Sequence, residues 1–300
     1  MKILITGGTG FVGRNLAEGL RDKYSVFTPT HEELDVENFS YVEKYITAHK
    51  IDIIIHAALQ GGDTVLETML IMFASILRNA GKVDKIIYFG SGAEYAKIRD
   101  LKKVKEEEIG KYIPKDNYGL GKYICNQLAS NEKKIINLRL FGIYGKYENY
   151  LFKFISNSIA KNLLGLPIQI KQDVLFDYLY IDDLIPVVEY FLNHKSPYRD
   201  YNITPNKSIT LKEICEIINE ITKIPSKISI GNKKQNFIYT GDDARILKTI
   251  PNLHFTSYED GIGKLFSYHK DNIKKLDRNA LIKDDYLARV SSGLLLKSTS

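Results

Sequence analysis

Tyr118 and Lys122 lie four residues apart in DNYGLGKYICNQLA, a stretch with the pattern of a helix start. Four residues is just over one helical turn, so both side chains lie on one face of the predicted helix. An ammonium group beside a phenol stabilises the phenolate and lowers the pKa of the phenol. Such a tyrosine can transfer protons near neutral pH, so the pair is a candidate for acid–base catalysis. An exposed tyrosine beside a solvated lysine is the alternative, because the chain has 20 tyrosines and such pairs also arise by chance.

The first turn of the chain, GGTGFVG, has the spacing of a phosphate-binding loop. Three of its glycines, Gly7, Gly10 and Gly13, follow a short apolar run and open a helical pattern. The first glycine permits a tight turn, the second lets the backbone approach a pyrophosphate, and the third lets the helix pack closely on the strand. The N–H groups at the start of the helix then face the phosphates. A turn without a ligand is the alternative. We expect a dinucleotide, held by Gly7, Gly10, Phe11, Val12 and Gly13.

Short apolar runs alternate with helical patterns along the first half of the chain. The apolar runs are KILITGG, YSVFTPT, IDIIIHAAL, KIIYFGS and KIINLRLFGIYG. This alternation is typical of an α/β fold with a doubly wound parallel sheet, the Rossmann arrangement, whose buried strands are continuously apolar. The stretch FDYLYIDDLIPVVEYFL is expected to add one more strand and helix to that sheet.

After Gly145 the chain is expected to leave the sheet and to form a smaller C-terminal α/β lobe. In that lobe TLKEICEIINEIT begins with a capping box from Thr210 to Glu213. The predicted dinucleotide-binding domain spans 1–148 and about 172–198, the substrate-binding lobe spans about 149–171 and 199–285, and a loose tail spans 286–300.

Composition limits the classes of protein to which the chain can belong. The 300 residues are 44% hydrophobic and 26% charged, as in globular proteins, and no apolar run reaches the length of a membrane span. The net charge of +6 suits a small anionic ligand but is too low to indicate nucleic acid. The chain opens on MKILITGG, which has the pattern of a strand and a turn, so we expect no signal peptide. Cys125 and Cys215 lack a CxxC or histidine pattern, so we expect no metal site and two reduced thiols in a cytoplasmic protein.

The glycine spacing is GxxGxxG, and further motifs follow it in order. They are IIHAAL, YFGSGAEY, YGLGK, LRLFGIYG, FDYLYIDDL, YNIT and GIGKLFSYHK, and with the glycines they extend over about residues 2–270. Together they resemble the extended branch of the short-chain dehydrogenase/reductase superfamily, which comprises NAD-dependent nucleotide-sugar epimerases, dehydratases and reductases. The resemblance implies an NAD(P)-dependent enzyme with a small nucleotide-sugar substrate and without nucleic-acid or membrane partners.

The resemblance also implies roles for residues at the centre of the motifs. Tyr118 would be the catalytic acid/base, Lys122 would lower its pKa and bind the nicotinamide ribose, and Ser91 would hydrogen-bond the reacting oxygen. Ala57 and Ala58, in IIHAAL, would lie beside the cofactor. The histidine of the same motif, at position 56, either touches the cofactor or is a buried histidine with its own hydrogen bonds.

Departures from the family motifs reduce the number of reactions that the chain is expected to catalyse. Gly92 and Ala93 stand where the dehydratases of this branch carry an Asp–Glu pair, which disfavours dehydration. The related 3,5-epimerase/4-reductases have a cysteine at the position of Ala93 and a histidine in the helix that begins near Tyr150, and this chain has neither. The reactions left are those at C4 of the sugar. Reduction of a 4-keto sugar is favoured, 4-epimerisation with tightly bound NAD is the alternative, and a non-catalytic cofactor-binding sensor or scaffold is a further one.

The segment after the second strand, FTPTHEELDVEN, bears on the choice of cofactor. NAD-preferring relatives commonly place an aspartate at the end of that strand, where it binds the ribose hydroxyls. Here TPTH carries no acidic residue, although Glu32 and Glu33 follow, and there is no arginine for a 2′-phosphate. The resemblance to sugar-nucleotide reductases favours NADP(H) over NAD(H), with His31, Asp35 and Val36 at the cofactor.

Phe176 stands where the extended branch of the superfamily usually has an arginine that binds the diphosphate of the substrate. Arg245 and Lys171 are candidates to replace that arginine, and otherwise the substrate is not an ordinary nucleotide sugar. Two further candidates for substrate contact are Ala93, in the serine motif, and Tyr144, in the loop LRLFGIYG that borders the sugar in the family.

Two predictions concern the adjacent aspartates and the assembly. Asp182 and Asp183 would point to opposite sides of a strand, so we expect a structural role in capping or backbone bonding rather than a metal site. The apolar helix over 64–78 and the helix of Tyr118 are predicted to pair across a two-fold axis in a homodimer. Burial of both helices inside one subunit is the alternative.

Overall fold

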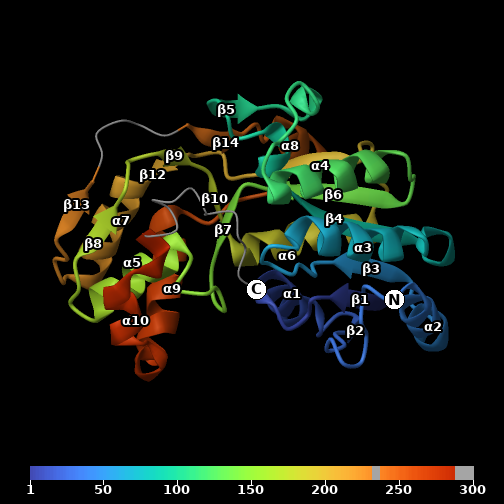
Figure 1. The fold of residues 1–300 in the computed structure, drawn as a ribbon, viewed down its shortest axis with the longest axis horizontal. Coiled ribbons are helices and arrows are strands. Elements are labelled where there is room, and N and C mark those ends of the chain that lie inside the picture. The colour runs from blue at the N-terminus through green and yellow to red at the C-terminus, as the bar shows by residue number, and fades with distance from the viewer. Residues whose placement is uncertain (232–236, 288–300) are drawn as a thin grey trace.

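A six-stranded parallel sheet forms the centre of the molecule in the computed structural model, which describes residues 1–231 and 237–287. Its strand order is β11-β6-β4-β3-β1-β2 (Figure 1). This sheet confirms the predicted α/β fold with a doubly wound parallel sheet. The strands are β1 (Lys2–Thr6), β2 (Ser25–Phe27), β3 (Ile53–His56), β4 (Lys85–Ser91), β6 (Ile135–Leu140) and β11 (Asp200–Ile203).

Each face of the sheet is covered by its own helices. Ile3 and Ile5 of β1 belong to the core under α1 and α6, whereas Leu4 belongs to the core under α2, α3 and α4. Because successive residues of a strand face opposite sides, the continuous apolar runs of the sequence fill both cores. The helices are α1 (Phe11–Leu20), α2 (Phe39–His49), α3 (Val65–Leu77), α4 (Asn117–Ser130) and α6 (Leu184–Asn193).

The smaller lobe consists mainly of helices that pack on one another (Figure 1). The capping box predicted at the start of α7 is present. The Thr210 hydroxyl accepts a hydrogen bond from the Glu213 N–H at 3.1 Å, and the Glu213 carboxylate accepts one from the Thr210 N–H at 2.8 Å. The lobe elements are α5 (Phe154–Leu163), β8 (Ile168–Ile170), α7 (Leu211–Thr222), β13 (Ile228–Ile230), α9 (Tyr258–Asp271) and α10 (Arg278–Lys283).

Short strands lie between the sheet and the lobe. Two of them, β7 (Gly142–Tyr144) and β10 (Tyr178–Tyr180), pair in parallel. Four others form a sheet in the order β12-β9-β14-β5. These are β5 (Leu101–Val104), β9 (Leu175–Phe176), β12 (Ile209–Thr210) and β14 (Tyr239–Gly241). The 3₁₀ helix η2 (Gly92–Tyr95) lies next to β14, and α8 (Ala244–Thr249) packs on β11 of the main sheet.

The last strand of the main sheet is not the one that the sequence predicts. The strand in FDYLYIDDL is β10, which pairs with β7 outside the six-stranded sheet. The edge beside β6 is filled instead by β11, from the range that the sequence analysis assigned to the lobe. Both segments are short and rich in apolar and aromatic residues, so their pattern does not distinguish which of them pairs with β6. The sheet therefore extends to residue 203, and the other boundaries between the two parts stay predictions.

The predicted loose tail begins inside folded structure. Tyr286 lies in a helical turn, and its ring centroid is 6.0 Å from that of Phe154 in α5. The prediction is wrong for this residue, because an aromatic side chain packed on a helix is held in place. The remainder of the predicted tail, residues 288–300, lies outside the described residues.

Cys125 and Cys215 are both free thiols, and both are buried. In the part of the chain that the structure describes, no helix is long and apolar enough to span a bilayer.

Candidate active site

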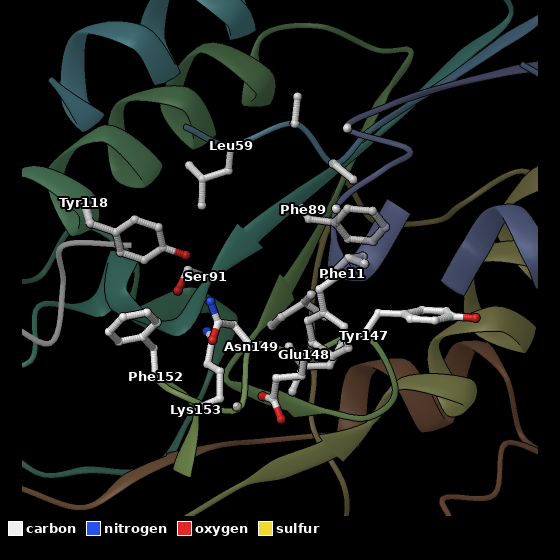
Figure 2. A pocket seen from close by; sticks show the side chains of 18 of the residues that line it. Phe11, Leu59, Phe89, Ser91, Tyr118, Tyr147, Glu148, Asn149, Phe152 and Lys153 are labelled. Carbon is white, nitrogen blue, oxygen red and sulfur yellow. The ribbon is translucent and has the colours of Figure 1, made fainter. Parts of the chain in front are cut away.

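A cavity of about 1160 Å³ lies between the carboxyl ends of the main-sheet strands and the smaller lobe. Residues at the ends of β1, β3, β4 and β6 line one side of it, and residues of α5, β8 and α9 line the other. Open α/β sheets bind their ligands at the carboxyl ends of the strands. The cavity is therefore the candidate active site, and Figure 2 shows part of its lining.

The glycine loop forms one end of the cavity. Gly7 has a φ of +69°, and its carbonyl oxygen accepts a hydrogen bond from the Gly10 N–H at 3.0 Å. A Cβ on Gly13 would lie 2.2 Å from that carbonyl oxygen, so only glycine lets α1 begin this close to the loop. A Cβ on Gly10 would meet no atom nearer than 3.3 Å, so the space above the loop can hold a pyrophosphate. Phe11 and Val12 line the cavity with Gly7 and Gly10, whereas Gly13 packs beneath the loop.

The other predicted cofactor residues lie along the same end of the cavity. His31, Asp35 and Val36 line it after β2, and Ala57 and Ala58 line it after β3. The Asp35 carboxylate accepts a hydrogen bond at 2.9 Å from the backbone N–H two residues further on, so the backbone orients it. A Cβ on the first glycine of the loop would lie 2.7 Å from the backbone of Ala58, so the β1 and β3 loops are in contact. These residues fit the adenosine half of a dinucleotide.

Ser91, Tyr118 and Lys122 lie together on the wall of the cavity. Ser91 ends β4, and the other two residues belong to the first turns of α4, which the Asp116 side chain caps. Figure 2 shows the Tyr118 and Ser91 hydroxyl groups pointing toward one another. The Lys122 ammonium lies 5.9 Å from the centroid of the Tyr118 ring and donates a hydrogen bond to the Phe89 carbonyl oxygen at 2.7 Å. The structure thus brings together the three residues that the sequence selected as catalytic.

Burial sets the pKa values of this group. Burial raises the pKa of Tyr118, and the hydrogen bond from Ser91 opposes this only in part. Burial also lowers the pKa of Lys122. Burial is thus the largest influence on the Tyr118 pKa in this structure, and the lowering of that pKa by Lys122 stays a prediction.

Glu94 and Arg139 hold the turn that follows Ser91. The Ser91 N–H donates to one Glu94 carboxylate oxygen at 2.8 Å, and Arg139 Nε donates to the other at 2.8 Å. Both charged side chains are fully buried, and Arg139 also bonds Asp200 of β11 at 3.2 Å. Sequence reasoning missed both residues. The available signal was an arginine inside the apolar run IINLRL, since a buried arginine needs a carboxylate partner.

Phe176 lines the cavity, and its ring lies against Tyr239 with centroids 5.7 Å apart. Arg245 does not line the cavity, contrary to the prediction that it replaces the family arginine. Its guanidinium donates to the Asp200 carboxylate at 2.9 Å and forms an ion pair with Glu107. Arg245 belongs to α8, which packs beside β11. Lys171, the other candidate, does line the cavity.

Two further substrate candidates also lie outside the cavity lining. Ala93 is fully buried in η2, beneath Ser91. Tyr144 is 1% exposed, and its ring packs against Tyr180 with centroids 5.5 Å apart. A Cβ on Gly261 would meet the Tyr144 hydroxyl at 2.2 Å, so α9 covers this side chain. Neither side chain therefore lines the cavity in this structure, and contact of either residue with a substrate stays a prediction.

Several charged and polar cavity residues were not expected from the sequence. Figure 2 shows Glu148, Asn149 and Lys153 on the segment that leads from β7 to α5. Burial raises the pKa of Glu148 to about 7, and its carboxylate accepts a hydrogen bond from the Ser156 hydroxyl at 2.6 Å. Lys97, two residues after η2, also lines the cavity, as does the aromatic residue at position 286 near the end of the chain. Only the polar cluster KYEN after a predicted strand hinted at this group.

His56 fits both alternatives that the sequence left open. Its Nδ1 shares a hydrogen bond of 2.7 Å with the Thr6 hydroxyl, and it is buried at the end of β3. It also lines the cavity. Burial lowers its pKa to about 3, so the imidazole is neutral at physiological pH.

Of the adjacent aspartates, Asp183 has the structural role that was expected, although both residues lie in the 3₁₀ turn η4 (Ile181–Asp183) and not on a strand. The Asp183 carboxylate accepts hydrogen bonds from the Thr256 N–H at 2.9 Å and from the Thr256 hydroxyl at 2.6 Å, which ties α6 to the segment before α9. Among the described residues, no group of three or more potential metal ligands is present.

A doubly wound sheet with a glycine turn after its first strand, and with a cavity at its carboxyl edge, is the architecture of dinucleotide-dependent α/β enzymes. The chain belongs to the NAD dependent epimerase/dehydratase family, whose model matches residues 3–204. This membership confirms the resemblance drawn from the motifs and the assignment of the chain to NAD(P)-dependent enzymes.

Two curated relatives illustrate the range of the family. The chain is 26% identical over 254 residues to GDP-L-colitose synthase of Yersinia pseudotuberculosis, covering 74% of this chain and 82% of the relative. It is 26% identical over 296 residues to dTDP-4-dehydro-6-deoxyglucose reductase of Escherichia coli, covering 82% of this chain and 88% of the relative.

Solved structures share the fold over nearly the whole chain. The NADP-bound GDP-mannoheptose C4 reductase of Campylobacter jejuni matches with a TM-score of 0.76 at 20% identity, over 90% of this chain and 98% of that one. The UDP-glucose 4-epimerase of Thermotoga maritima matches with a TM-score of 0.78 at 19% identity, over 91% and 100%.

Proposed function

We propose that this protein is an NAD(P)-dependent oxidoreductase that reduces C4 of a 4-keto, nucleotide-linked sugar. The observation that carries the proposal is the grouping of Ser91, Tyr118 and Lys122 in the cavity that also contains the glycine loop. A dinucleotide lying on that loop would extend toward these three residues. The lobe side of the same cavity leaves room for a second, sugar-sized ligand.

The proposed reaction requires one hydride and one proton. A bound nicotinamide supplies the hydride to C4. Tyr118 donates its hydroxyl proton to the C4 oxygen, while the Ser91 hydroxyl hydrogen-bonds the same oxygen. Because burial raises the pKa of Tyr118, the tyrosine holds this proton at neutral pH before the reaction. Lys122, one turn along α4, stabilises the phenolate that remains.

A nucleotide-linked sugar is the substrate class that the relatives support. Those named above include a reductase of a dTDP-linked 4-keto sugar, a GDP-sugar synthase and a GDP-heptose C4 reductase. The basic side chains in the lobe half of the cavity, Lys153 and Lys171, suit an anionic substrate.

We propose NADP(H) as the preferred cofactor. The stretch TPTH after β2 has no carboxylate to repel a 2′-phosphate, and the Asp35 carboxylate is occupied by a backbone N–H. The C. jejuni reductase was solved with NADP.

The first experiment identifies any nucleotide released from the purified protein and titrates the apo form with NADH and NADPH. Reversible binding of NADPH, followed by its oxidation in the presence of a 4-keto nucleotide sugar, supports the reductase. Failure of both dinucleotides to bind would contradict every enzymatic assignment. Tyr118→Phe should keep NADPH binding and lose the oxidation.

A nucleotide-sugar 4-epimerase is the second candidate, because the same three residues serve that reaction and the T. maritima 4-epimerase shares the fold. Tightly bound NAD that co-purifies with the protein and is not consumed would favour it over the reductase. Unchanged biological activity of Tyr118→Phe would instead favour a non-catalytic cofactor-binding protein.

We also propose a homodimer in the cytoplasm. α3 and α4 pack side by side, and each leaves a large apolar side chain 40% exposed, Ile71 and Leu128. Light scattering that finds a monomer would remove the dimer. The two free thiols suit a reducing compartment.

A further inference from the structure

Lys97 extends into the cavity beside the residues assigned to the reaction. It follows η2 and is the sixth residue after Ser91 in the chain. Its ammonium lies 4.0 Å from the centroid of the Tyr239 ring. The Tyr239 hydroxyl in turn lies against Gly92, since a Cβ on that glycine would be 2.6 Å from the oxygen. The ammonium is therefore one aromatic ring away from the turn that carries Ser91.

No carboxylate neutralises Lys97 at close range. Within residues 1–231 and 237–287, none of the ion pairs includes Lys97 or Lys153. Asp116 and Lys153 act on Lys97 at longer range and with opposite effects. Figure 2 shows Lys153 and Asn149 reaching from the lobe side toward Ser91.

The surroundings of Lys97 favour exchange between its charged and neutral forms. Burial first, and then the neighbouring Lys153, lowers the pKa of Lys97 to about 8, while Asp116 opposes the change. About a tenth of such amines are neutral at pH 7. A lysine that is desolvated and next to a second cation is a common form of activated base or nucleophile. The Tyr239 face is uncharged and contributes only a cation–π contact.

A 4-keto sugar presents such a base with a suitable proton. The hydrogens on C3 and C5 are acidic, because loss of either leaves an enolate whose negative charge lies on the C4 oxygen. In the proposed function Tyr118 and Ser91 already donate hydrogen bonds to that oxygen, and such donors stabilise an enolate as well as an alkoxide.

We propose that Lys97 is a second proton-transfer residue, which removes and returns a proton on a carbon next to the C4 carbonyl, so that the site exchanges this proton with solvent in addition to reducing C4. This proposal rests on the proposed function. The C–H bond breaks as the N–H bond forms, its electron pair moves to the C4 oxygen, and reprotonation restores the ketone. No oxidant or reductant is consumed.

The test separates this exchange from the reduction. The full-length protein is incubated in D₂O with NADP⁺, which cannot reduce the substrate, and with dTDP-4-dehydro-6-deoxyglucose or a GDP-linked 4-keto-6-deoxyhexose. Loss of the C3 or C5 proton signal is followed by NMR against an enzyme-free sample. NADPH oxidation with the same substrates is measured in parallel. We expect the wild type to exchange a proton and Lys97→Arg to exchange it about 100-fold more slowly, the scale of lost general-base catalysis, with reduction largely kept.

Arginine keeps the positive charge but does not act as a base, so Lys97→Arg distinguishes proton transfer from simple binding of a substrate group. Lys97→Met should also lose exchange, and Lys102→Arg, at an exposed position of β5, should change neither activity. Three results would overturn the proposal: reduction without exchange in the wild type, equal exchange in Lys97→Arg, or equal loss of both activities in Lys97→Arg and Lys97→Met. If the wild type neither exchanges nor reduces any 4-keto nucleotide sugar, the proposed function itself fails, and this inference fails with it.

Discussion

At the scale of single residues, burial rather than charge pairing controls the acid–base groups of the cavity. It raises the pKa of Tyr118, lowers that of Lys122, and brings those of Glu148 and Lys97 to about 7 and about 8. Each shift favours the neutral form, as expected where water is excluded. Protons can therefore be held or released in this cavity close to neutral pH.

Tyr118→Phe is expected to lower kcat by about 10²–10⁴, because the C4 oxygen loses its proton donor while the ring and its packing remain. The dissociation constant for NADPH should stay within a factor of about three, since a lost hydroxyl removes at most one hydrogen bond to the cofactor. Steady-state kinetics and a fluorescence titration measure the two quantities. Tyr112→Phe, at a side chain that is 46% exposed, is the matched control and should behave as the wild type.

Glu148→Gln is expected to remove a pH-dependent loss of stability. Burial raises the pKa of Glu148 from 4.5 to about 7, so folding favours the protonated acid. The protonated Glu148 carboxyl makes its whole contribution to the free energy of unfolding below pH 4.5. This contribution is lost as the pH rises through 7. A shift of this size corresponds to about 3 kcal/mol, an upper limit because the residue borders the cavity. Urea unfolding at acidic and alkaline pH should find the variant more stable than the wild type only at alkaline pH.

Glu220→Gln, at an exposed position of α7, controls for the removal of one carboxylate. It should follow the pH dependence of the wild type. The same behaviour in Glu148→Gln would show that folding does not disfavour ionisation of the Glu148 carboxyl.

At the scale of elements, the buried pair of Glu94 and Arg139 joins η2 to β6 and, through Asp200, to β11. Arg139→Met should lower the free energy of unfolding by about 3–5 kcal/mol, because Glu94 is left charged and buried without its partner. Denaturant unfolding measures this loss. The double variant with Glu94→Gln should be less destabilised than Arg139→Met, since no lone charge remains. An additive double variant would mean that the pair does not interact.

The glycine loop supports a second prediction at this scale. In Gly13→Ala the new methyl group would lie 2.2 Å from the Gly7 carbonyl oxygen, so α1 must move away from β1. We expect the affinity for NADPH to fall at least tenfold, because the N–H groups at the helix start no longer converge on the pyrophosphate. Isothermal titration measures it. Gly81→Ala, where a Cβ meets no atom within 4 Å, should bind as the wild type, and equal binding by Gly13→Ala would contradict a cofactor at this loop.

Local features of the elements could be predicted from the sequence, whereas contacts between distant elements could not. The glycine loop and the turn that separates Tyr118 from Lys122 are local, so spacing alone predicted them. Glu94 pairs with Arg139 across 45 positions, and nothing local records such a contact. β10 and β11 were confused because strand pattern reports burial and not the neighbouring strand. For the same reason the motif around Tyr144 was found, but the direction of its side chain was not.

At the scale of the whole molecule, the cavity depends on residues from both ends of the chain. The glycine loop begins at residue 7, and Tyr286 closes the lobe side against Phe154. Lys161 and Asp284 form an ion pair at 2.6 Å that attaches the same C-terminal turn to α5. The substrate half of the cavity is therefore completed only by the end of the described chain.

Tyr286→Ala is expected to raise KM for the sugar substrate about tenfold and to change kcat by less than threefold, because a large aromatic wall is lost from the substrate side and no reacting group is touched. Steady-state kinetics with saturating NADPH measures both constants. Ile282→Ala, at a side chain of α10 that is 59% exposed, is the control. A fall in kcat without a change in KM would contradict a substrate-facing role for Tyr286.

The order of the strands has a consequence for synthesis on the ribosome. β6 ends at Leu140, but its outer partner β11 begins at Asp200, about 60 residues later, after the chain has passed through α5 and β8 of the lobe. At a translation rate of about 5–20 residues per second, the nascent sheet carries an open edge for several seconds. That edge bears Arg139 before the Asp200 carboxylate is available to it. An unpaired strand edge is a template for association with other chains. During this interval the growing protein is therefore expected to be open to association with other chains through the edge of β6.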